Sequence, residues 1–178
     1  TGPESPQRTS GMSTRQFGIS GQAFYVPPFR VSLQDWCAWT NNPWDKVRKV
    51  VGNGFRIPGL HENAYTMAAN AVMRLIKQYD VDTTKIKFFA LGTESSTDNS
   101  AGAIIIKGMI DQALISQGKL PISRNCEVPE FKHACLGGVY AMKGALRQLA
   151  LDGSGYQAIV VCSDIAEYQL GTSGEPTH

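Results

Sequence analysis

Cys135 is the residue of this 178-residue chain whose surroundings most favour chemistry. It lies in the segment 131–138, FKHACLGG, between a strand-like run and a glycine-flanked amphipathic helix. A thiol at a helix N-terminus meets the positive end of the peptide dipoles and unpaired N–H groups, and both favour the thiolate. The glycines allow another backbone or an acyl group to approach. The pattern predicts a nucleophile, and a small structural cysteine is the alternative.

Glu94 is the carboxylate best placed to act together with Cys135. An acyl group on a thiolate is a thioester, and a base near its α-carbon can generate an enolate. Glu94, Cys135 and Asp164 each follow a predicted strand. Because the carboxyl ends of parallel strands meet at one edge of a sheet, we expect these residues to lie there together. Alternatively, each carboxylate could complement the dipole of a following helix.

His133 lies two positions before Cys135. On a strand that continued through both residues, the two side chains would point to the same side. A pairing with Cys135 is one interpretation, and a surface or core histidine is the other. The same alternation places Lys132 on the opposite face.

Hydrophobic periodicity predicts strands and helices in alternation. Apolar residues indicate helices at 63–79, 101–117 and 139–149, and strands at 17–26, 86–91, 126–131 and 158–162. A short helix carries Trp36 and Trp39, and the stretch from there to Gly59, rich in Asn, Gly and Pro, is predicted to be mostly loop. The order βαβαβαβ is typical of an α/β fold with a mostly parallel sheet covered by helices.

The length, composition and charge of the chain indicate how many domains it has and which partners are excluded. With 42% hydrophobic residues the chain can bury a core, as one domain or as half of a larger one. The N-terminal residues are polar, so we expect a disordered leader or an expression scar at 1–16 and the fold in 17–178. Seventeen basic residues against fifteen acidic ones leave a net charge of +2, and the basic residues are scattered. This gives no support to a nucleic-acid partner.

The absence of membrane-span, signal-peptide and paired-cysteine patterns indicates the compartment of the protein and the redox state of its cysteines. No apolar stretch has the length of a membrane span, and the N-terminus has no signal-peptide pattern, so we expect a cytoplasmic protein without a membrane partner. The four cysteines form no C-x-x-C pair, which argues against a zinc site and a disulfide framework. We expect reduced thiols and no metal, with Cys37, Cys126 and Cys162 as structural residues.

Three motifs occur in order along the chain, LGTES at 91–95, HACLGG at 133–138 and SDIAEY at 163–168. At these separations they resemble the active-site segments of 3-hydroxy-3-methylglutaryl-CoA (HMG-CoA) synthases, which belong to the thiolase superfamily. The resemblance extends from about Gly18 to the last residue and includes the tail 171–177. It implies half of a thiolase-like fold, in which two βαβαβαββ halves pack as five αβαβα layers and the complete unit forms a homodimer.

The resemblance also implies roles for individual residues. Cys135 would be acetylated by acetyl-CoA or an acetylated carrier protein, and Glu94 would deprotonate the acetyl methyl group. The enolate would attack the ketone of an acetoacetyl-type thioester, and water would release a 3-hydroxy-3-methylglutaryl-type product. No cofactor is implied beyond the thioester substrates. Five further motif residues are expected to bind substrate or support the site: His133, Gly137, Gly138, Ser163 and Asp164.

Two departures from the family pattern concern the substrate and the missing half. Mevalonate-pathway members carry a TNACYGG type of turn, whereas 132–138 reads KHACLGG. The lysine resembles the polyketide-associated branch that installs β-methyl branches on carrier-bound chains, so CoA and a carrier protein both stay open. The family's acceptor-polarising histidine lies in the second half of the fold. We therefore expect a fragment or one subunit of a split enzyme, with a second chain bringing that half and most CoA or carrier contacts.

Two alternative functions remain at this point. A ketosynthase III would pair its cysteine with His and Asn and would not need Glu94, whereas a long-chain head-to-head condensing enzyme also uses a glutamate. From another class, a non-catalytic partner subunit would keep the half-fold for assembly or carrier docking. The presence of both Cys135 and Glu94 favours a catalytic subunit.

Overall fold

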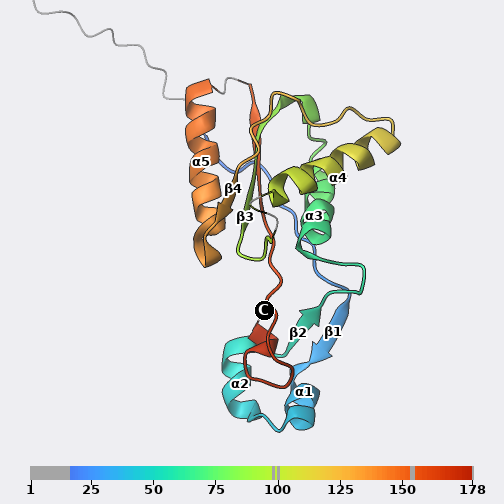
Figure 1. Ribbon diagram of the computed structural model, residues 1–178, viewed down its shortest axis with the longest axis vertical. Coiled ribbons are helices and arrows are strands. Elements are labelled where there is room, and N and C mark those ends of the chain that lie inside the picture. Colours follow the sequence, from blue (N-terminus) through green and yellow to red (C-terminus); the bar gives the residue numbers. More distant parts are fainter. Residues whose placement is uncertain (1–16, 98, 100, 153–154, 178) are drawn as a thin grey trace, which may run out of the picture.

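A three-stranded parallel sheet with helices on both faces forms the main body of the protein (Figure 1). The computed structural model describes residues 17–97, 99, 101–152 and 155–177, so the leader expected at 1–16 lies outside the described residues. The strand order is β4-β3-β5, with the bounds β3 (Ile86–Thr93), β4 (Glu130–Lys132) and β5 (Gln157–Cys162). One face is covered by α5 (Gly137–Asp152), the other by α3 (Ala64–Gln78) and α4 (Gly102–Ser116).

The central strand β3 is buried on both faces because its sequence, IKFFALGT, is apolar almost throughout. Phe89 and Leu91 pack into the larger core, against Ile106 and Ile110 of α4. Phe88 faces the opposite layer, where α5 offers small alanines. Each large apolar side chain buried here contributes about 1.5–3 kcal/mol to stability. The strand therefore holds its carboxyl end, from which Glu94 follows, in a fixed place.

The predicted helices and most predicted strands of this body are confirmed. The helices expected at 63–79, 101–117 and 139–149 are α3, α4 and α5, and the strands at 86–91 and 158–162 are β3 and β5. The strand expected at 126–131 is extended and bonded to β3 from Glu127 onward, where Phe89 N–H donates to the Glu127 carbonyl at 2.8 Å. The ladder assigned to β4 begins only at Glu130, because Pro129 has no N–H to donate.

The strand predicted at 17–26 is wrong. This segment is extended, but within the described part of the chain it joins no ladder. Its polar groups instead bond to side chains near α3: Arg74 donates to the Phe24 carbonyl at 3.0 Å, and Tyr25 hydroxyl donates to Glu62. The alternation of small and apolar residues correctly indicated extended backbone, but a strand also needs a neighbouring strand.

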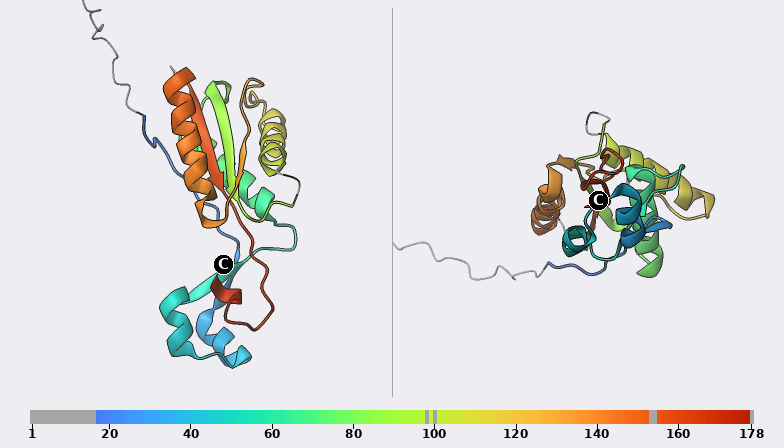
Figure 2. Two further views of the ribbon diagram at one scale, coloured as in Figure 1. Left: turned by 60° about the vertical axis from the view of Figure 1, so that its left-hand side comes forward. Right: turned by 90° about the horizontal axis from the view of Figure 1, so that it is seen from below.

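A small unit lies beyond the carboxyl ends of the strands, where the sequence predicted mostly loop after the first short helix (Figures 1 and 2). It consists of β1 (Phe29–Ser32), α1 (Leu33–Thr40), α2 (Trp44–Val51) and β2 (Gly54–Ile57), with β1 and β2 antiparallel. Its own core contains Leu33, Trp36, Cys37 and Val47. The loop prediction was wrong because α2 has only two turns, so its apolar spacing was too short to outweigh the flanking Asn, Gly and Pro residues.

The segment after β5 returns to this small unit and ends beside it in the 3₁₀ helix η3 (Glu175–Thr177). The carboxylate of Glu175 accepts hydrogen bonds from the Trp36 indole at 3.1 Å and from Gly171 N–H at 2.6 Å. Asn42 donates to the Gly171 carbonyl at 2.9 Å. These contacts fasten the small unit to the main body. Among the described residues, no helix is both long and apolar enough to cross a membrane.

Candidate functional site

The residues that sequence analysis selected lie at the carboxyl edge of the sheet. In the parallel register, Thr93 of β3 is paired with Lys132 of β4, and Gly92 is paired with Cys162 of β5. Glu94 follows the first of these pairs directly. Cys135 follows Lys132 by three residues, in the 3₁₀ turn η2 (Ala134–Leu136) that contacts β3. The parallel sheet therefore brings the thiol-bearing turn and the carboxylate-bearing turn to the same edge.

The close approach of two backbones sets the position of these turns. A Cβ atom on Gly92 would lie 2.6 Å from the carbonyl carbon of Gly137 and would also collide with the backbone of Gly138. A Cβ on Gly137 would lie 2.7 Å from the Phe131 carbonyl oxygen, and one on Gly138 would collide with the Cys162 sulfur. The start of α5 can therefore rest directly on the end of β3 only because these positions have no side chain.

Cys135 occupies an exposed position in the turn immediately before α5. The turn is closed by Leu136 N–H, which donates to the His133 carbonyl at 2.9 Å, and Ala134 takes a positive φ of 33°. The expected strand ends at Lys132, so strand alternation does not place His133 beside Cys135. The His133 ring instead packs on Tyr140 of α5, with the ring centroids 5.1 Å apart.

Asp164 ties the turn that carries Glu94 to the end of β5. Its Oδ1 accepts hydrogen bonds from the Thr93 hydroxyl and Glu94 N–H, both at 2.7 Å, and from Ser95 N–H at 3.1 Å. Ile165 N–H in turn donates to Ser95 Oγ at 2.9 Å. A carboxylate that gathers several donors in this way forms charge-assisted hydrogen bonds. Asp164 therefore fixes the backbone from which the Glu94 side chain projects.

Neither carboxylate takes the helix-dipole position that was the alternative. No helix directly follows Asp164 in the described chain, which continues as coil until a turn at Leu170. At the N-terminus of α4 it is Glu130 whose Oε2 accepts from Ala103 N–H, at 3.2 Å. Ser163, expected to support the site, donates through its hydroxyl to the Ala64 carbonyl at 2.7 Å and so joins the start of α3 to β5.

Sequence analysis assigned no role to Thr93 and Ser95, although both lie in the motif 91–95, and it missed Ser96. All three carry hydroxyl groups in the run 91–96, LGTESS, which follows a buried strand directly. Such residues readily hydrogen-bond to nearby backbone and favour turns. The composition of this run was a usable signal, but the partners of these hydroxyl groups lie far away in sequence.

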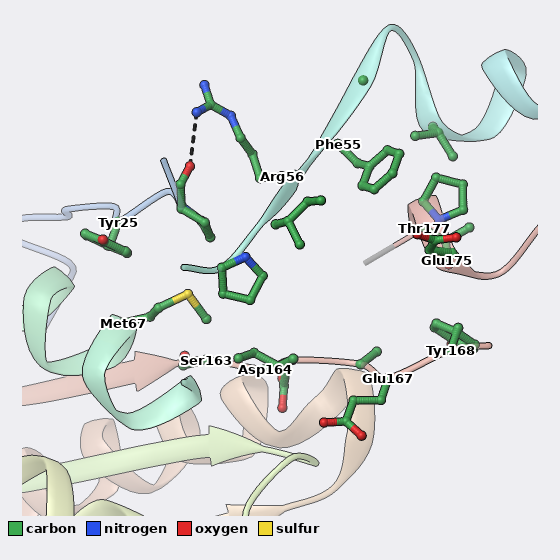
Figure 3. A pocket seen from close by; sticks show the side chains of 18 of the residues that line it. Tyr25, Phe55, Arg56, Met67, Ser163, Asp164, Glu167, Tyr168, Glu175 and Thr177 are labelled. Atoms are coloured by element: carbon green, nitrogen blue, oxygen red, sulfur yellow. Dashed lines mark hydrogen bonds between the residues drawn. The ribbon is translucent and has the colours of Figure 1, made fainter. Parts of the chain in front are cut away.

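A cleft of about 880 Å³ lies between the small unit and the segment that follows β5 (Figure 3). Its walls include Tyr25, Phe55 of β2 and Met67 of α3, and its other side is formed by 162–168. In Figure 3 the Asp164 carboxylate points away from the cleft, toward the end of β3. A volume of this size falls in the range typical of small-molecule sites. The cleft thus borders the carboxyl edge of the sheet through Asp164.

The four thiols differ in their surroundings. Burial raises the pKa of the Cys126 thiol to about 11. Burial also raises the pKa of Cys162, and the nearby Asp164 carboxylate adds to this rise. Cys37 is buried in the core of the small unit, whereas Cys135 and Cys162 are exposed at the surface.

Known proteins similar to this chain include hydroxymethylglutaryl-CoA synthases. The family model "Hydroxymethylglutaryl-coenzyme A synthase N terminal" matches residues 13–178. A hydroxymethylglutaryl-CoA synthase of Enterococcus faecalis is 29% identical over 161 residues, which cover 90% of this chain and 39% of that protein. MvaS in complex with 3-hydroxy-3-methylglutaryl coenzyme A has a TM-score of 0.79 and 31% identity, over 90% of this chain and 37% of that one.

A more distant structure shares the fold. The curacin pathway HMG synthase in complex with holo donor-ACP has a TM-score of 0.71 at 21% identity, over 83% of this chain and 34% of that one. These likenesses confirm the predicted thiolase-like α/β fold. The chain spans between 34% and 39% of the length of the three similar proteins.

We expect the four thiols to react with iodoacetamide at very different rates in the folded protein. With a pKa of about 11, the Cys126 thiol is protonated at neutral pH, and its thiolate fraction rises about tenfold per pH unit up to pH 10. Peptide mapping should therefore find exposed Cys135 alkylated first at pH 7.5, and Cys126 only as the pH rises. Equal labelling of all four thiols in urea is the control. Rapid alkylation of Cys126 at pH 7.5 would contradict its burial.

The substitution Gly92→Ala should destabilise the protein by about 1–3 kcal/mol, because the added methyl group meets backbone atoms that cannot rotate away. Gly108→Ala is the matched control: nothing lies within 4 Å of its Cβ position in α4, so it should stabilise by about 0.5–1 kcal/mol. Urea unfolding measures both. A Gly92→Ala protein as stable as the wild type would show that the two backbones can separate freely.

Proposed function

This chain belongs to the hydroxymethylglutaryl-coenzyme A synthase family, and from that premise we propose that it supplies the nucleophile and the general base of an acyl-transferring condensing enzyme. Cys135 is the proposed nucleophile and Glu94 the proposed base. The observation that carries the proposal is the direct contact of Gly92 with Gly137 and Gly138, which places the turns of both residues at one edge of the sheet. The exposure of Cys135 leaves its sulfur open to a substrate.

The first proposed step loads the enzyme. The thiolate of Cys135 attacks the carbonyl carbon of an acetyl thioester, and the thiol of CoA or of a carrier protein leaves. The turn of Cys135 leads directly into α5, and the positive end of the helix dipole can stabilise negative charge that develops there. No group besides the thioester and the protein side chains is needed for this step.

The second proposed step forms the carbon–carbon bond. The Glu94 carboxylate removes a proton from the methyl group of the acetyl-cysteine, and the resulting enolate attacks the ketone of a β-ketoacyl thioester. Water then hydrolyses the link to Cys135, which frees the thiol and releases a 3-hydroxy-3-methylglutaryl-type product. The hydrogen bonds from the segment 93–95 to Asp164 support this role, because they hold the base in one place during proton transfer.

We propose that the remaining part of the fold, in the same or in another polypeptide, supplies the histidine that polarises the acceptor ketone. No histidine of this chain is assigned that role. The outer face of α5 supports a partner at this position, since Val139, Met142 and Leu146 are 59%, 42% and 40% exposed at helical spacing. Homodimerisation of the complete unit is part of the same proposal.

The proposed substrates are acyl thioesters carried by CoA or by an acyl carrier protein. Two similar proteins have been solved with such groups: MvaS with 3-hydroxy-3-methylglutaryl coenzyme A, and the curacin HMG synthase with holo donor-ACP. Both carriers end in a flexible arm with a terminal thiol. The cleft beside Asp164 is a suitable entrance for such an arm, because of its volume and its mixed apolar and polar lining.

Acetylation of Cys135 tests the proposed nucleophile. We expect an acetyl adduct in the intact mass of the assembled enzyme after incubation with acetyl-CoA or an acetylated carrier protein, and no adduct in the Cys135→Ala variant. Cys162→Ala is the matched control, because Cys162 ends β5 outside the turn of Cys135, and burial raises the pKa of its thiol, which disfavours the thiolate. If the wild type acquires no adduct from either donor, the chain is a non-catalytic subunit and the proposed function is wrong.

The Glu94→Gln substitution separates loading from condensation. The amide cannot accept the methyl proton, so we expect acetylation of Cys135 to persist while condensation falls by about 100-fold or more. Glu127→Gln provides a control, because this exposed carboxylate bonds to Gln148 and its residue pairs with Phe88, toward the start of β3 and away from its carboxyl end. The assay measures acetyl-enzyme by mass and condensed product by chromatography. Full condensation by Glu94→Gln would remove Glu94 from the mechanism and favour a ketosynthase III type of reaction.

A further inference from the structure

We propose that Lys132 is a positioning residue that sets the place of Glu94 relative to Cys135. This inference rests on the proposed function, and it assigns a role to a side chain for which the sequence indicated a strand face and a family resemblance but no role. Lys132 is the last residue of β4, the strand that leads into the turn of Cys135. Its ammonium group donates a hydrogen bond to the carbonyl of Ser96, two residues after Glu94. One side chain thus connects the two turns.

The acceptor of this hydrogen bond is well buried. Ser96 is only 2% exposed, although it is a polar residue in a loop. A second element holds it from another side, because the Tyr65 hydroxyl of α3 lies 3.4 Å from Ser96 Oγ as its donor. A buried carbonyl requires a partner, and a charged donor forms a stronger bond than a neutral one. The contact with Lys132 is therefore a specific constraint on the loop.

Lys132 and Asp164 hold the same segment from opposite neighbouring strands. Asp164 accepts hydrogen bonds from residues 93–95 on the side of β5, and Lys132 bonds to residue 96 on the side of β4. Within the described part of the chain, the Glu94 carboxylate itself makes no hydrogen bond or ion pair. Its direction is therefore set by the backbone on either side of it. Loss of the hydrogen bonds to Asp164, or of the hydrogen bond from Lys132, would let the Glu94 carboxylate move with respect to Cys135.

Acetylation of Cys135 and deprotonation of the acetyl group depend differently on the position of the loop 93–96. Loading needs only the Cys135 thiolate and the acetyl thioester. Proton abstraction needs the Glu94 oxygen at contact distance from the acetyl methyl group, and a misplacement of about 1 Å can reduce a rate about 100-fold. A loosened loop should therefore spare acetylation and slow deprotonation.

The decisive comparison uses Lys132→Met, Lys132→Arg and the wild type in the assembled enzyme. Lys132→Met should acetylate Cys135 within about twofold of the wild-type rate, whereas exchange of the acetyl methyl protons with D₂O should fall about 10- to 100-fold. Lys132→Arg retains charged donors and should restore most of the exchange. Lys77→Met, an exposed lysine in the last turn of α3, is the matched control and should change neither rate. Equal loss of both steps, or no loss of either, would overturn the proposal.

A second measurement does not depend on the chemistry. Hydrogen–deuterium exchange followed by mass spectrometry should show faster exchange across 93–97 in Lys132→Met, with α5 and α3 unchanged. A wild type that neither loads nor exchanges would refute the proposed function, and the exchange of 93–97 would still decide whether Lys132 holds the loop. Unchanged exchange across 93–97 would refute the role of Lys132 even if the enzyme loads normally.

Discussion

The contact between the end of β3 and the start of α5 is the constraint on which the site depends. At Gly92, Gly137 and Gly138 the two backbones touch without side chains between them. This contact lets the turn of Cys135 lie against the central strand, whose buried residues cannot shift without disturbing the core on both faces. A side chain at any of the three positions would separate the thiol-bearing turn from the strand that leads to Glu94.

The loop after β3 shows how a rigid sheet can orient an exposed side chain. Glu94 is itself exposed, and its neighbours in sequence carry the hydrogen bonds that fix it. The partners come from different elements: Asp164 follows β5, Lys132 ends β4, and Tyr65 belongs to α3. The backbone of the loop is therefore held in place by elements of the sheet and by α3. The carboxylate that it carries stays available for a substrate.

The sequence predicted most of the main body and the position of Glu94 and Cys135 at one edge of the sheet, because these follow from local periodicity and from the geometry of parallel strands. It failed at 17–26 and at α2, where an extended or helical segment is decided by what lies beside it. It also missed the roles of Ser96 and Lys132. These residues lie 36 positions apart, so their contact depends on the packed fold and leaves no local pattern.

The two faces of α5 link the reactive edge to the proposed second half of the fold. Its inner face carries Ala141 and Ala145, which are small enough to let the helix lie close against β3. Its outer face presents larger apolar residues, such as Val139 and Met142. Because the turn of Cys135 leads directly into this helix, a partner that packs on the outer face would be positioned relative to the thiol by the same element. The acceptor-polarising group could then meet an acetyl-cysteine whose base is already held by the sheet.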